Sequence, residues 1–95
     1  MRIHCAILAF AVVLAAPARA AVIDLSTMKC KEFMESSKDE IGIILTWLDA
    51  YYREDDDPPV IDTEKFVDNA KKLATSCAAN PTIGLITTAD KLFSK

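Results

Sequence analysis

The stretch SKDEIGIILTWLDAYY, residues 37–52, has the apolar spacing of an α-helix and decides the fold class. Ser37 can accept a hydrogen bond from the first amides of this helix, and Glu40 three residues later completes a capping box. At about 100° per residue, the polar positions share one narrow stripe, which comprises Gly42, Thr46, Asp49 and Arg53. The apolar residues fill the remaining arc of roughly 220°, about twice the width that docking on one core requires.

A helix this apolar must be covered on more than one side. One interpretation is a surface for a partner, above all a second copy of the chain. The other is a central helix that its neighbours wrap on three sides, and the two patterns look the same in sequence. If a partner covers the helix, the predicted dimer or client surface comprises Ile43, Ile44, Trp47, Leu48 and Tyr51.

The rest of the chain after residue 20 also has helical rather than alternating apolar spacing. The sequence therefore predicts an all-α fold, a small bundle of about four short helices. We expect one helix over residues 27–35, capped by Ser26 or Thr27, and another from Asp62 or Thr63 to residue 79. The last helix is predicted to begin with Asn80 as its cap and Pro81 as its first residue.

An acidic stretch with two prolines, residues 54–59, separates the second and third predicted helices. Proline lacks an amide and restricts the residue before it, so this stretch is predicted to be a loop. Its carboxylates are a candidate acid-sensing loop, made of Glu54, Asp55, Asp56 and Asp57. A solvated loop without such a role is the plainer alternative.

Residues 1–20 are typical of a secretory signal peptide. Arg2 precedes an apolar run over residues 5–16, which is shorter than the roughly twenty residues that cross a bilayer. Ala18 and Ala20 supply the small residues that signal peptidase requires. We expect cleavage after Ala20, export to the periplasm and a single helical domain over residues 21–95, with an uncleaved anchor as the alternative.

Export would leave two cysteines, Cys30 and Cys77, in an oxidising compartment, where we expect them to form one disulfide. Such a bond would stabilise a domain of this size by about 4 kcal/mol on the chain-entropy account. A small domain buries little surface, so a covalent link is expected on physical grounds. A metal-binding or catalytic thiol pair is the alternative, but the chain has neither a C-x-x-C motif nor a histidine after residue 20.

The predicted mature chain carries few groups for chemistry. Its glycines, Gly42 and Gly84, are isolated, so no phosphate-binding loop is present, and the absence of histidine excludes Ser-His and Cys-His nucleophiles. We expect no catalytic residue, cofactor or metal site, and no enzyme. Residues 21–95 carry a formal charge of −5, which argues against a nucleic-acid partner and against stable association with an anionic membrane.

The same composition makes the chain sensitive to acid. Without histidine, its charge changes little between pH 5 and 8. Below about pH 5, all fourteen carboxylates begin to protonate, and the net charge moves from −5 towards about +10. A marginally stable bundle with one covalent link should then loosen without unfolding completely.

Three segments carry a family resemblance: TMKCKEF at residues 27–33, the tryptophan-containing residues 43–52, and CAANP at residues 77–81. Together they resemble the HdeA/HdeB family of periplasmic acid-stress chaperones, and the tryptophan segment is nearer the HdeB branch. The resemblance implies a disulfide-linked helical fold that is a homodimer near neutral pH. It also implies that acid exposes apolar surface, which holds unfolding periplasmic proteins out of aggregates without ATP.

We therefore expect an acid-activated periplasmic holdase whose partners are acid-unfolded client proteins. The alternative is a protein-binding module or inhibitor that uses its wide apolar helix to bind one specific partner at neutral pH.

Overall fold

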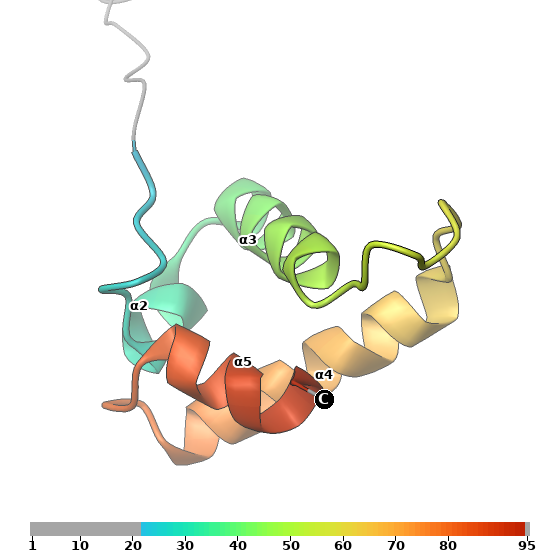
Figure 1. Cartoon of the computed structure of the whole chain (residues 1–95). Helices are drawn as coiled ribbons and strands as arrows, with labels where there is room; N and C mark the ends of the chain where they lie inside the picture. The colour runs from blue at the N-terminus through green and yellow to red at the C-terminus, as the bar shows by residue number, and fades with distance from the viewer. Residues whose placement is uncertain (1–21, 95) are drawn as a thin grey trace, which may run out of the picture.

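The computed structural model describes residues 22–94, and within this range the chain forms four α-helices and no strand. They are α2 (Cys30–Glu35), α3 (Lys38–Tyr51), α4 (Thr63–Ala79) and α5 (Leu85–Phe93). Figure 1 shows α2, α4 and α5 gathered together, with α3 alongside them and a long loop joining α3 to α4. The all-α prediction is confirmed, whereas the predicted signal peptide lies outside the described residues.

Local capping signals place the starts of the two longest helices where the sequence predicts them. The Ser37 hydroxyl accepts a hydrogen bond of 3.2 Å from the Glu40 amide at the start of α3. The Asp62 carboxylate accepts one of 3.0 Å from the Lys65 amide at the start of α4. Each bond satisfies an amide that has no partner within its own helix.

The helix α2 begins at Cys30, three residues later than predicted, and neither Ser26 nor Thr27 caps it. The Asp24 carboxylate accepts hydrogen bonds from the amide and the hydroxyl of Ser26, and these bonds hold the preceding residues in a turn. This turn competes with helix formation, so the helix starts only at Cys30. The expected start near Thr27 is wrong.

The start of α5 also differs from the prediction. Asn80 ends α4, where its side-chain amide donates to the Ser76 carbonyl at 3.1 Å, and Pro81 lies in a turn before Leu85 begins α5. The connecting residues 81–83 instead accept hydrogen bonds from the first amides of α2. The Cys30 amide donates to the Ile83 carbonyl at 2.8 Å, and the Lys31 amide donates to the Pro81 carbonyl at 2.9 Å. This long-range pairing satisfies amides that α2 cannot satisfy itself, and it outweighs the local Asn-Pro signal.

The core lies where the four helices meet, and the disulfide runs through it. Cys30 of α2 and Cys77 of α4 form the predicted bond, with their Cα atoms 4.8 Å apart. Both cysteines are fully buried. The other buried apolar side chains around them are Phe33, Ile44, Leu48, Leu73, Leu85 and Ala89. Every helix therefore contributes to a single core, and α3 contributes Ile44 and Leu48.

Candidate functional site

An apolar stripe runs along the outer side of α3, made of Ile43, Trp47 and Tyr51, and we call it the outer stripe. These residues are four positions apart, so they lie on one face of the helix. Trp47 and Tyr51 stack with ring centroids 4.6 Å apart and an interplanar angle of 16°. All three side chains are exposed, Ile43 by 61% and Trp47 by 47%. The stripe is therefore an apolar surface that the rest of residues 22–94 leaves about half exposed.

The other two residues of the predicted dimer or client surface lie in the core. Ile44 is 1% exposed and Leu48 is 3% exposed, because both face the neighbouring helices. Each follows an outer-stripe residue by one position, which turns it about 100° around the helix axis. In the described chain, Ile44 and Leu48 therefore face the core, and α3 is not wrapped on three sides. Binding of a second copy or of a client by the five predicted residues stays a prediction.

A groove of about 680 Å³ runs beside the outer stripe. One wall is the outer stripe itself, and the other is formed by residues 22–26 and the first turn of α5. Apolar side chains from all three segments line it, among them Val22, Leu25, Trp47 and Ile86. A groove with these walls suits an apolar polypeptide segment or a second apolar helix.

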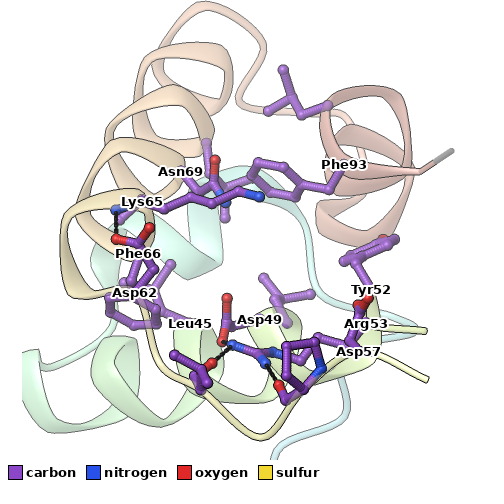
Figure 2. Close-up of a pocket in the computed structure, with 16 residues that line it drawn as sticks. Leu45, Asp49, Tyr52, Arg53, Asp57, Asp62, Lys65, Phe66, Asn69 and Phe93 are labelled. Atoms are coloured by element: carbon purple, nitrogen blue, oxygen red, sulfur yellow. Dashed lines mark hydrogen bonds and ion pairs between the residues drawn. The ribbon is translucent and has the colours of Figure 1, made fainter. Parts of the chain in front are cut away.

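A second cavity, of about 490 Å³, lies between α3, α4, α5 and the proline-containing loop (Figure 2). Apolar side chains form part of its walls, among them Leu45, Phe66, Leu73, Leu92 and Phe93. Charged groups also line it, contributed by Asp49, Arg53, Asp57, Asp62 and Lys65. The space is therefore amphipathic.

Arg53 holds the loop in place at this cavity. Its guanidinium donates to the Val60 carbonyl at 2.7 Å and to the Pro58 carbonyl at 3.3 Å. It also lies 3.5 Å from the Asp49 carboxylate on the last turns of α3. Figure 2 marks these contacts with dashed lines.

At the end of α3, the Tyr52 hydroxyl donates a hydrogen bond of 2.5 Å to the Asp90 carboxylate on α5. The Tyr52 ring also packs against Phe93, with centroids 5.8 Å apart. Partial burial of the phenol, and next the Asp90 carboxylate, raise the pKa of Tyr52 above its usual value, because both disfavour the phenolate. Sequence reasoning missed this contact: its partners are 38 positions apart, and neither residue belongs to a motif.

The predicted acid-sensing loop, residues 54–57, is exposed along its length and forms a closed turn. The Asp57 carboxylate accepts a hydrogen bond of 2.8 Å from the Glu54 amide, and the Asp57 amide donates to the Glu54 carbonyl at 3.1 Å. Asp57 also lines the second cavity, whereas Asp55 and Asp56 do not. The structure thus brings one of the four predicted residues to a cavity, and acid sensing by this loop stays a prediction.

The outer stripe, the groove beside it and the second cavity are the candidate binding surfaces of residues 22–94. Residues 22–94 hold no group of three or more histidine, cysteine or carboxylate side chains placed to bind a metal ion. No helix in this range has the length and apolar character needed to span a bilayer.

Comparison with known proteins supplies a family. A family model described as HdeA/HdeB matches residues 2–87, nearly the whole chain. Neither the curated proteins nor the solved structures contain a match.

Proposed function

The chain belongs to the HdeA/HdeB family, and we propose that it is a periplasmic holdase that acid activates and that needs no ATP. The family is known for periplasmic chaperones of acid stress and not for enzymes. In this proposal the chain is exported, binds proteins that acid has unfolded, and prevents their aggregation.

The outer stripe is the observation that carries the proposal. Three large apolar side chains lie in a row on α3 beside an apolar groove. An exposed apolar patch of this kind is typical of an interaction surface. We propose that a second copy of the chain covers the outer stripe near neutral pH and that client segments replace this copy in acid.

The charge of the chain supports activation by acid. Protonation of its carboxylates reverses the net charge of residues 21–95, so two copies that each become strongly positive repel one another. Positive charge on the chaperone and on the acidified client would also keep their complex soluble.

Suppression of aggregation tests the proposal. An acid-denatured client protein is mixed with an equimolar amount of the chain between pH 2 and 7, and light scattering is recorded. We expect scattering to fall in acid and to be unaffected at pH 7. Absence of protection in acid at a several-fold excess of the chain would rule out the holdase.

Trp47→Ser and Val67→Ser form a matched pair for this assay, because Trp47 on α3 and Val67 on α4 are 47% and 48% exposed. Trp47→Ser should weaken protection, whereas Val67→Ser should leave it unchanged. If both substitutions changed protection equally, the outer stripe would not be the surface that binds the client. Recovery of one stoichiometric partner at pH 7, without acid, would instead favour a binding module.

A further inference from the structure

Among the described residues, one charged side chain lines the groove beside the outer stripe. This side chain is Asp24, which lies in the wall formed by residues 22–26. The other residues of that wall are apolar or uncharged, namely Val22, Ile23, Leu25 and Ser26. Asp24 is exposed to solvent, so its charge is accessible to a molecule that enters the groove.

Hydrogen bonds fix one oxygen of Asp24 and leave the other free. The Oδ1 atom accepts a hydrogen bond of 2.9 Å from the Ser26 amide and one of 2.5 Å from the Ser26 hydroxyl. The Oδ2 atom accepts no hydrogen bond and joins no ion pair with any residue from 22 to 94. Because each carboxylate oxygen has two acceptor positions, Asp24 can still bind a cationic group.

The bonds from Ser26 also affect the ionisation of Asp24. The Ser26 hydroxyl, and next the Ser26 amide, lower the pKa of Asp24 below its usual value, because both bonds stabilise the ionised carboxylate. In the described chain, the other titratable group that lines the groove is the phenol of Tyr51 on α3, and α5 contributes uncharged residues, Ile86 and Thr87. Asp24 therefore keeps its negative charge to a lower pH than an aspartate without such bonds.

The other wall of the groove offers a second kind of contact for a cation. Trp47 and Tyr51 stack in this wall and are 47% and 56% exposed. The face of an aromatic ring attracts an ammonium or guanidinium group, and tryptophan attracts it most strongly. The stem of lysine or arginine packs along apolar surface while its charged end reaches a polar partner. The groove thus combines apolar walls, aromatic rings and one carboxylate, which together suit a basic side chain within an apolar segment.

Acid changes the charge of an unfolded client in one direction. Its aspartate and glutamate side chains lose their charge as the pH falls, whereas its lysine and arginine side chains stay positive. The charged residues of an apolar client segment are therefore basic in acid. A groove that accepts such a segment needs a partner for a cation, because an unpaired charge against an apolar wall is costly.

We propose that Asp24 is the anchor by which the groove selects client segments, because it pairs with a lysine or arginine side chain that an apolar segment carries. The apolar part of the segment lies against the outer stripe, and the stem of the basic residue packs on the aromatic rings. This inference rests on the proposed holdase function and names the class of segment that the same surface binds.

The anchor reconciles binding with the charge of the two proteins. In acid the chain and its client are both strongly positive, so they repel one another at long range. A carboxylate that stays ionised at the groove attracts the basic side chain at short range, where the pair is partly removed from water. Positive charge elsewhere on both proteins still keeps the complex soluble.

Binding of two peptides with blocked termini tests the anchor. Both consist of leucine and asparagine around a central residue, which is lysine in one and norleucine in the other. Norleucine has the same four-carbon stem as lysine but no ammonium group. Trp47 is the only tryptophan of the chain and lies in the groove wall, so its fluorescence reports binding. The chain is purified from the periplasm with its disulfide intact and used at pH 4, at a concentration low enough to prevent competition by a second copy.

Asp24→Asn isolates the charge of the anchor. It should weaken binding of the lysine peptide about threefold, as expected for an exposed ion pair, and leave binding of the norleucine peptide unchanged. Asp68→Asn removes an exposed carboxylate on α4, outside the groove, and should change neither affinity. The amino terminus is the same in every variant, so its charge does not affect the comparison. Equal effects of Asp24→Asn on the two peptides, or of the two substitutions on the lysine peptide, would reject the anchor.

Ser26→Ala tests how the anchor stays ionised. The ratio of the affinities for the lysine and norleucine peptides is followed from pH 6 to pH 2, and it should fall as Asp24 becomes protonated. Loss of the Ser26 hydroxyl removes the larger of the two causes that lower the pKa of Asp24, so the ratio should fall at a higher pH in Ser26→Ala than in the wild type. The same midpoint in both proteins, or a ratio that does not change with pH, would contradict the proposal.

Suppression of client aggregation by the wild-type chain separates this inference from the holdase function. If the wild type suppresses aggregation in acid but Asp24→Asn affects the two peptides equally, the anchor is rejected and the holdase function stands. If the wild type does not suppress aggregation, the holdase function fails, whatever the peptides show.

Discussion

Replacing Ile43 and Ile44 by alanine, one at a time, measures how the structure divides α3 into a core face and an outer face. The two substitutions remove the same atoms from neighbouring positions, but Ile44 is 1% exposed and Ile43 is 61% exposed. For Ile44→Ala, the lost transfer free energy of three carbon groups is about 2.4 kcal/mol, and the cavity left behind raises the cost to about 3 kcal/mol.

For Ile43→Ala, less than half of the same transfer term applies, because most of the side chain is already in water. Alanine also has the higher helix propensity, which offsets about 0.4 kcal/mol. The expected cost is therefore about 0.5 kcal/mol, a small fraction of the cost at Ile44.

Urea unfolding followed by circular dichroism, with the disulfide intact and at pH 7, measures both values. The chain concentration is varied, since a dimer that buries Ile43 would add a concentration-dependent cost at that position. For a domain of this size, the Ile44→Ala cost corresponds to a midpoint lowered by about 3 M urea. Equal midpoints for the two variants at low concentration would refute the division of α3 into two faces.

Other predictions concern the disulfide, the partly buried phenol of Tyr52 and self-association. Reduction of the bond between Cys30 and Cys77 should lower the free energy of unfolding by about 4 kcal/mol, and an unchanged thermal midpoint after reduction would contradict the role of this bond as the main covalent constraint. Because the pKa of Tyr52 is raised in the folded chain, its contribution to stability is complete below about pH 10 and falls as the pH rises further. Unfolding measured between pH 9 and 12 should show this loss in the wild type and a smaller one in Tyr52→Phe; identical curves would contradict the assignment. Trp47→Lys should shift the chain towards monomer in sizing chromatography at pH 7, whereas Val67→Lys, at an equally exposed position, should not; an unchanged elution of Trp47→Lys would take the outer stripe out of the dimer interface.

Local signals in the sequence were sufficient for much of the fold. Ser37 and Asp62 cap helices because their side chains reach amides only three residues ahead. The proline-containing loop follows from the backbone limits of proline. The pairing of Cys30 with Cys77 follows from the count of cysteines that remain after the predicted cleavage.

Features that depend on distant residues were not predictable in the same way. Pro81 lies in a turn and does not start a helix, because the Pro81 carbonyl accepts a hydrogen bond from the Lys31 amide, fifty residues earlier in the chain. The periodicity of α3 also could not distinguish Ile43 from Ile44, since apolar residues surround most of the helix and only its neighbours define which side is inside. The contact between Tyr52 and Asp90 exists only once α3 and α5 have packed.

The central claim is that acid converts the chain into a protein that binds unfolded polypeptides through apolar surface. Sizing chromatography with light-scattering detection, applied to an equimolar mixture of the chain and an acid-unfolded client, measures this binding directly. The account predicts a soluble complex that contains both proteins at pH 3 and none at pH 7. Separate elution of the two proteins at pH 3, or the same complex at both pH values, would contradict it.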